Sequence, residues 1–362
     1  MNSNVVFLLG RKDEPTDAVE EYCYYLCEAL GNRSVRGKIV RVAWNERGWT
    51  RALQLLRQVA ENWRGRWVLL QYTALAWSGR GFPRRVPAVL EILRRAGARV
   101  GVAFHDVEPF AGKRAVDVLR RRFQLRVMRQ MLRAAELAVF TVSPSVVPWL
   151  SPTNKVVFIP VGANLPETQN GGAYADRQAG FTRIAVYGIT GGEAGSEECS
   201  EIARAIRFAT ARGAKLELHA FGRGAAEREK ELREQLKDVP VTLQFEGLLP
   251  AGRIAFLIRA ADATLFVRGP ISSRRGSAIA GIACGRPVIA YRGRETAAPI
   301  TEAGVMLVER DNPDELGAAL LRMATDRVLR NELSERSARA QKAFFGWGTI
   351  ADRYIEAMKL KT

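Results

Sequence analysis

Short apolar runs alternate with longer segments of helical periodicity along this chain. In the first half, runs rich in β-branched and aromatic residues predict strands at Val5–Leu9, Ile39–Trp44, Trp67–Tyr72, Val100–Phe104, Ala138–Val142 and Val156–Ile159. Segments between them, such as Ala18–Leu30 and Thr50–Trp63, have helical spacing. This alternation predicts parallel strands joined by crossover helices, with helices on both faces of the sheet.

A polar, glycine-rich segment, Pro166–Gly180, interrupts the pattern and predicts a linker. A second series follows, with strands expected at Ile184–Tyr187, Leu216–Ala220, Val241–Phe245, Thr264–Val267, Pro287–Tyr291 and Val305–Val308. Helices are expected at Cys199–Arg212, Ala225–Leu236 and Ile254–Ala261. The sequence therefore predicts an α/β protein with two Rossmann-like domains facing each other across a cleft. Ligands should bind at the carboxyl ends of the strands.

The composition narrows the class of protein. The chain has 362 residues, 55 basic and 38 acidic, and a formal net charge of +17, which favours anionic partners. Four cysteines without a CxxC pair and two histidines predict no metal site. We expect a cytoplasmic protein, because we find neither a signal peptide nor an apolar run long enough to span a membrane.

The loop after Thr264–Val267 offers the most informative candidate site. It carries hydroxyls, guanidinium groups and a glycine where a strand gives way to the helix expected at Ser277–Cys284: Ser272, Ser273, Arg274, Arg275, Gly276 and Ser277. Such a helix start can bind a diphosphate. The alternative is that Ser273 or Ser277 caps the helix while the arginines face water.

A second candidate loop is Tyr187–Ser196, where Gly188, Gly191 and Gly192 leave the backbone free to approach a phosphate or a sugar. A plain flexible turn is the alternative. The ends of the next two strands are assigned to the base side of a nucleotide: Gly222, Arg223, Glu246 and Gly247.

A third loop, Phe104–Phe110, carries His105, Asp106 and Glu108 after an apolar strand. A histidine and two carboxylates there can exchange protons or orient hydroxyls, so they are the candidate catalytic residues. The alternative is that His105 is a structural histidine.

The segment Lys113–Arg133 combines two stripes at helical spacing. Val116, Leu119, Phe123 and Val127 form an apolar stripe, and Arg122, Arg126, Arg129 and Arg133 form a basic one. Two interpretations stay open: an amphipathic helix packed on its sheet, or a contact with anionic lipid at a membrane surface.

The second half resembles the donor domain of GT-B glycosyltransferases, and in particular glycosyltransferase family 4. The resemblance rests on FEGLLP, LIRAADATLFVRG, IACGRPVIA and EAGVMLVERDNPDELGAAL, and on the terminal segment FFGWGTIADRYIEAM. It implies an acceptor-side domain at 1–165, a linker at 166–180, a donor domain at 181–340, and a final helix at 341–362 that crosses back to the first domain.

The chain departs from the family pattern at two positions. Aligned on Ala283-Cys284-Gly285, Ser272 and Ala280 stand where family members carry glutamates that contact the donor sugar and the ribose. The resemblance implies a metal-independent, retaining glycosyltransferase that moves a sugar from a nucleotide-diphospho-sugar to a hydroxyl acceptor, which could be lipid-linked, with no further cofactor. The alternatives are a catalytically degenerate GT-B binding or scaffold protein and a nucleotide-sugar epimerase. A nucleic-acid binder ranks last, since no recognition motif supports it.

Overall fold

The computed structural model describes residues 4–14, 17–110, 112, 114–166, 180–312 and 314–361. The chain divides into two compact units. The first unit contains residues 1–161 and 347–362, and the second contains residues 162–346. Most of the linker expected at 166–180 lies outside the described residues.

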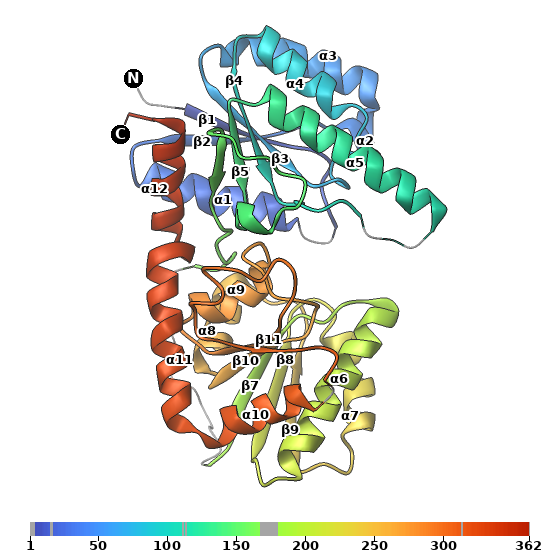
Figure 1. The fold of residues 1–362 in the computed structure, drawn as a ribbon, viewed down its shortest axis with the longest axis vertical. Coiled ribbons are helices and arrows are strands. Elements are labelled where there is room, and N and C mark those ends of the chain that lie inside the picture. The colour runs from blue at the N-terminus through green and yellow to red at the C-terminus, as the bar shows by residue number, and fades with distance from the viewer. Residues whose placement is uncertain are drawn as a thin grey trace. The chain divides into compact units, whose positions relative to one another are not determined.

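The first unit is a six-stranded parallel sheet covered by helices on both faces (Figure 1). Its strands are β1 (Asn4–Leu9), β2 (Arg36–Arg41), β3 (Trp67–Tyr72), β4 (Arg99–Phe104), β5 (Leu137–Phe140) and β6 (Val156–Phe158). Its helices are α1 (Ala18–Gly31), α2 (Trp44–Arg47), α3 (Trp49–Ala60), α4 (Val86–Arg95), α5 (Ala115–Ala134) and α12 (Trp347–Met358). The strand order is β2-β1-β3-β4-β5-β6.

Alternating apolar residues on the strands build the core of the first unit. One face of the sheet, with Leu70 and Phe104, packs against α3, α4 and α5. On α12, the hydroxyl of Tyr354 lies 3.1 Å from that of Tyr22 on α1, and Trp67 Nε1 donates to the carbonyl of Met358 at 2.9 Å. The carboxyl-terminal helix is therefore an integral part of the first unit.

The second unit repeats the architecture with the strand order β12-β11-β10-β7-β8-β9, all parallel. Its strands are β7 (Thr182–Tyr187), β8 (Leu216–Phe221), β9 (Val241–Glu246), β10 (Ala263–Phe266), β11 (Val288–Tyr291) and β12 (Val305–Val308). Its helices are α6 (Gly192–Thr210), α7 (Glu229–Gln235), α8 (Ala251–Ala260), α9 (Gly276–Ala283), α10 (Glu315–Thr325) and α11 (Arg327–Ala340). A π-helical turn, Gln341–Phe345, follows α11.

Both sheets are parallel and six-stranded, which confirms the predicted α/β class with two Rossmann-like units. The expected strands are all present, but β2 lies earlier than the predicted Ile39–Trp44. The edge position explains the error: β2 pairs with β1 alone, so it tolerates Arg36 and Lys38, whereas Trp44 already begins α2.

Helix α6 begins seven residues before the predicted Cys199, so Gly192 and Gly195 are helical rather than part of a loop. Glycine lowers helix propensity, but packing overrides it here. A Cβ at Gly195 would lie 1.9 Å from the carbonyl oxygen of Thr190, so no larger residue fits. The side chain of Glu198 also accepts a hydrogen bond from the Thr190 backbone at 2.8 Å, which ties the first turn to the preceding loop.

Helix α5 does not bury the predicted apolar stripe along its whole length. Val127 is buried and Phe123 half-buried, but Val116 and Leu119 are exposed. In the first turns Asp117 faces inward instead, because its carboxylate accepts from the Arg114 backbone at 3.1 Å and pairs with Arg120. Lys113 lies outside the described residues.

Candidate functional site

The carboxyl ends of β7 and β10 mark the point in the second unit where the strand order reverses. From β7 the chain proceeds through β8 to β9 on one side, and then returns to place β10 on the other side of β7. In open parallel sheets such a switch point leaves a crevice between the two strand-end loops, where ligands bind. The two loops that flank it are the predicted glycine loop, after β7, and the predicted Ser–Arg loop, after β10.

Both loops lead into a helix whose first turn has no side-chain cap. The N-cap residues are Gly191 for α6 and Arg275 for α9, and neither helix has a hydrogen bond from a capping side chain. Among the described residues, a Cβ at Gly192 would meet no atom within 4 Å, and one at Gly276 would meet the carbonyl oxygen of Gly162 at 4.0 Å. Uncapped amides and helix dipoles at neighbouring strands favour an anion.

The hydroxyls of the Ser–Arg loop are inside the unit. Ser272 and Ser273 are both buried, and within the described parts of the chain Oγ of Ser272 has no hydrogen-bond partner. Ser277 is a helical residue in the first turn of α9, so it does not act as the cap. The N-cap position of α9 is Arg275 and not a serine.

The two neighbouring arginines of this loop have different surroundings. Arg274 forms a two-point ion pair with Glu295, with Nε and Nη2 at 2.7 and 3.0 Å from the carboxylate oxygens. Its guanidinium thus already has an acidic partner. Arg275 is half-buried at the start of α9, and its Nη2 would lie 3.9 Å from a Cβ at Gly269.

Arg268, which sequence reasoning did not single out, bridges the two loops. It lies two residues after the end of β10, and its Nε donates to Oγ1 of Thr190 at 3.4 Å. Its Nη1 would lie 3.0 Å from a Cβ at Gly188, whose φ of +78° also requires glycine. The signal in the sequence was its position: it is the first charged residue after an apolar strand at the switch point.

The predicted base-side residues lie next to the glycine loop. The backbone of Gly222 donates to Gly247 at 2.9 Å, and the backbone of Ile189 donates to Arg223 at 2.9 Å. Glu246 is engaged by two cations or potential cations: its Oε1 lies 2.9 Å from Nε2 of His219 and 3.4 Å from Arg253. The ends of β7, β8 and β9 therefore form one continuous surface of the second unit.

His219 belongs to a buried polar row under this surface. Arg183 on β7 pairs with Glu217 on β8 at 3.0 Å, and both are 3% exposed. Burial lowers the pKa of His219, while the charge and hydrogen bonding of Glu246 act in the opposite direction. The lowered pKa favours the neutral form of His219 at physiological pH.

The predicted catalytic residues belong to the first unit. His105 Nε2 lies 2.9 Å from Oε1 of Gln71, and its ring meets Tyr22 edge-on at 5.3 Å. Asp106 accepts a hydrogen bond from the Ala74 backbone at 2.8 Å, so it anchors the loop after β3. Glu108 is half-buried two residues further on.

Tyr72, beside these residues at the end of β3, was not predicted. Its hydroxyl is buried and lacks a hydrogen-bond partner within the described segments. Burial and the negative charge of Asp106 raise the pKa of Tyr72 well above its usual range, so the hydroxyl stays protonated. It offers a donor next to the candidate catalytic loop.

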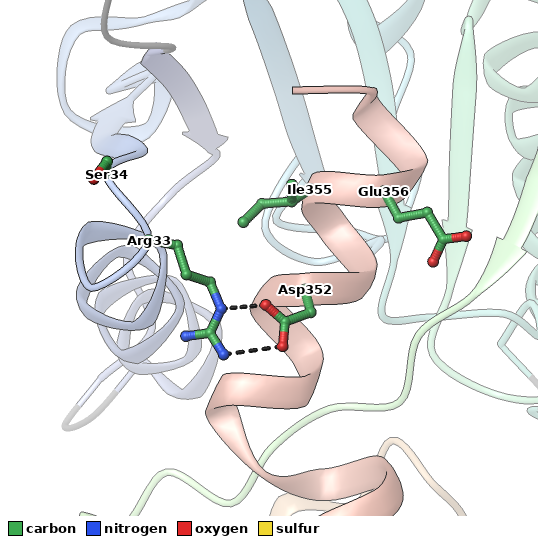
Figure 2. Close-up of a pocket in the computed structure, with 5 residues that line it drawn as sticks. All are labelled: Arg33, Ser34, Asp352, Ile355 and Glu356. Atoms are coloured by element: carbon green, nitrogen blue, oxygen red, sulfur yellow. Dashed lines mark hydrogen bonds and ion pairs between the residues drawn. The ribbon is translucent and has the colours of Figure 1, made fainter. Parts of the chain in front are cut away.

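A surface hollow of about 520 Å³ in the first unit lies away from these strand ends, between the end of α1 and α12 (Figure 2). Arg33, Ser34, Asp352, Ile355 and Glu356 line it. Arg33 forms a two-point hydrogen-bonded ion pair with Asp352, which lowers the pKa of that carboxyl. This ion pair joins the turn after α1 to α12. Among the described residues we find no cluster of three or more potential ligands that could hold a metal ion, and no helix long and apolar enough to cross a bilayer.

Comparisons with known proteins identify the fold. No family model matches the sequence, and no curated protein matches it. Among solved structures, HepE from Anabaena in complex with UDP and glucose matches with a TM-score of 0.67 at 15% identity, covering 99% of each chain. Sucrose-phosphate synthase from Thermosynechococcus elongatus matches with a TM-score of 0.66 at 17% identity, covering 99% of this chain and 98% of that one.

A protein from Listeria monocytogenes described as a UDP-N-acetylglucosamine 2-epimerase is also similar, with a TM-score of 0.59 at 12% identity. The match covers 99% of this chain and 96% of that one. At such identities the likeness establishes the GT-B-like fold of the whole chain. Function must be argued from the site.

Proposed function

We propose that this chain is a glycosyltransferase that moves a sugar from a nucleotide-diphospho-sugar to a hydroxyl acceptor, without a metal ion and with retention of configuration. One observation carries the proposal. Two helices with uncapped starts, α6 and α9, follow neighbouring strands at the switch point of the second unit, and Arg268 lies between their loops. A nucleoside diphosphate supplies the anionic group that such a site would hold.

The second unit would bind the donor. The amides at the starts of α6 and α9, with Arg268 and Arg275, would stabilise the negative charge that grows on the departing diphosphate. Arg274, already paired with Glu295, would hold the loop in shape. Gly222, Arg223, Glu246 and Gly247 remain the proposed base side, and Gly188 allows close approach of the backbone.

The resemblance to glycosyltransferase family 4 belongs to this proposal. Ser272 stands where that family's pattern has a carboxylate for the donor sugar, and its buried hydroxyl has no hydrogen-bond partner among the described residues. Ala280 is buried in α9 and cannot hydrogen-bond a ribose through its side chain. We therefore expect this chain to contact the ribose differently from family members.

The first unit would supply the acceptor side. His105, Asp106 and Glu108 remain the proposed catalytic or orienting residues, with Gln71 fixing the imidazole of His105. Because Asp106 already anchors the backbone at Ala74, we assign it a positioning role.

The direct test measures donor cleavage and transfer. Purified protein is incubated with a panel of nucleotide-diphospho-sugars and candidate acceptors, and released nucleoside diphosphate is quantified. We expect turnover that Arg275→Ala, or Arg274→Ala with Arg275→Ala, abolishes, whereas Arg322→Ala on α10 leaves it unchanged. Binding without turnover in any acceptor mixture would favour the degenerate scaffold instead, and full turnover in the double variant would refute the site.

A nucleotide-sugar epimerase is the second candidate. It is supported by the similarity to the Listeria monocytogenes protein and to MnaA from S. aureus in complex with UDP, at a TM-score of 0.62 and 12% identity. The two reactions separate cleanly in an experiment without acceptor. Incubation with UDP-N-acetylglucosamine alone, followed by NMR, should show no C2 epimer if the chain is a transferase; its appearance would establish the epimerase.

A further inference from the structure

We propose that the outward face of α5 in the first unit is a docking surface for an anionic lipid bilayer, with an apolar tip that inserts among the headgroups. This inference does not depend on the proposed enzyme activity. It rests on how the first turns of α5 are exposed, how they are fixed, and how charge is distributed along the helix.

The tip is apolar and open to solvent. Phe110, Val116, Val118 and Leu119 are 51%, 46%, 50% and 61% exposed. Single exposed apolar residues are common on protein surfaces, but several gathered at one projecting point indicate a contact site. Figure 1 shows the amino-terminal end of α5 projecting from the rest of the first unit.

The tip is also rigidly built. Gln124 accepts a hydrogen bond from the Phe110 backbone and donates to the carbonyl of Gly81, both at 2.8 Å. Arg120 donates to the carbonyl of Arg80 at 3.0 Å, and its guanidinium lies 4.8 Å from the centre of the Phe110 ring. These bonds therefore hold the Phe110 backbone and the first turns of α5 to the loop at Arg80 and Gly81.

Behind the tip, the same face of the helix is basic. Exposed residues at spacings of three and four continue from Val118 and Leu119 through Arg122, Arg126, Arg129 and Arg133. The one acidic residue of α5, Asp117, is buried and paired with Arg120, so it does not offset them. The helix has 20 residues and is thus about 30 Å long, long enough to lie along a membrane surface.

This pattern favours a bilayer over other polyanions. Arginines alone would suit nucleic acid or an acidic protein equally well. An apolar tip followed by a basic stripe on one helix face matches an anionic membrane. There the arginines would contact the headgroups, and the apolar residues would enter the acyl boundary.

The first experiment is vesicle sedimentation with the full chain. We expect binding to vesicles that contain phosphatidylserine and none to pure phosphatidylcholine, with affinity falling as salt rises. Each arginine near such a surface raises the affinity for the membrane by a factor of about five. Replacing Arg122, Arg126, Arg129 and Arg133 with Gln should therefore weaken binding by roughly several hundredfold.

A matched control separates this face from net charge. Replacing Arg204, Arg322, Arg327 and Arg339 with Gln removes the same charge from exposed helical positions of the second unit. Binding within a few-fold of the wild type is expected for that control. An equal loss in both quadruple variants would overturn the proposal, because it would reduce the effect to overall charge.

Insertion is tested by fluorescence. The fluorescence of the added tryptophan in Leu119→Trp is obtained by subtracting the wild-type spectrum. It should shift to shorter wavelength when anionic vesicles are added. In Val59→Trp, on the exposed side of α3, the added emission should not shift. Wild-type protein that binds duplex DNA or polyglutamate but not anionic vesicles would refute the lipid surface, and so would an unshifted Leu119→Trp in the vesicle-bound state.

Discussion

Arg268 Nε donates to Oγ1 of Thr190 across the point where the strand order of the second unit reverses. The bond joins the loop after β10 to the loop after β7, and it holds a guanidinium above the backbone of Gly188. Under the proposed function, this fixed cation would lie ready for a diphosphate before any ligand arrives.

Arg268→Ala should weaken binding of a nucleoside diphosphate by roughly 10- to 100-fold, the value of a charge-assisted hydrogen bond. Arg268→Lys keeps the charge but not the planar fork, so an intermediate loss is expected. Isothermal titration calorimetry with UDP measures both. An unchanged dissociation constant in Arg268→Ala would remove this residue from the site.

Glu295→Gln should destabilise the protein by about 1–2 kcal/mol, since Arg274 would lose a two-point partner at a site that is mostly buried. Glu309→Gln is the matched control: its ion pair with Arg292 is about half exposed and should contribute about 0–1 kcal/mol. Urea unfolding compares the two variants. Equal effects would indicate that the Arg274 pair is no stronger than a surface pair.

Glu217→Leu should cost about 3–5 kcal/mol, because Arg183 would remain buried without its carboxylate. Replacing both, Arg183→Met with Glu217→Leu, should recover most of that loss, as a well-packed apolar pair avoids the desolvation cost. Chemical denaturation tests this double-mutant cycle. If Glu217→Leu were as stable as the wild type, the Arg183–Glu217 ion pair would contribute nothing to the free energy of unfolding.

The lowered pKa of His219 makes stability depend on pH. Below the unfolded value of about 6.5, the unfolded chain binds a proton at this position that the folded chain does not. Stability from His219 is therefore present above pH 6.5 and is lost as the pH falls toward the folded pKa.

His219→Gln should flatten the dependence of unfolding free energy on pH between about 5.5 and 7. The chain has two histidines, so His105→Gln provides the control for the other imidazole. NMR titration of the ring protons assigns each pKa directly. A His219 resonance that titrates above 6.5 would contradict the assigned direction.

The strands were predictable because each is a compact apolar run, and a parallel sheet buried on both faces requires such runs. Val305–Val308 and Trp67–Tyr72 were predicted with the observed bounds. The start of α6 was not, because Gly192 and Gly195 disfavour a helix locally and only contacts with Thr190 explain it. Tertiary contacts of that kind leave no trace in hydrophobic periodicity.

The candidate site was predictable in its location and less so in its partners. Loops at strand ends follow from the alternation of strands and helices, so Gly188 and Ser272 could be singled out. The pairing of Arg274 with Glu295, 21 residues later, depends on how β11 places its following loop. The exposed tip of α5 was missed for a similar reason, since helical spacing does not tell where a sheet ends beneath a helix.

The most direct test of the account is nucleotide binding by the second unit within the intact chain. A thermal-shift panel of nucleoside diphosphates and nucleotide sugars, without added metal, should give a clear shift with at least one base. A ligand at 100 times its dissociation constant stabilises by about 2.7 kcal/mol. The account predicts that Arg275→Ala and Arg268→Ala each lower the shift to about half or less, while Arg322→Ala retains it in full. No shift with any nucleotide, or a shift that both site variants retain, would contradict it.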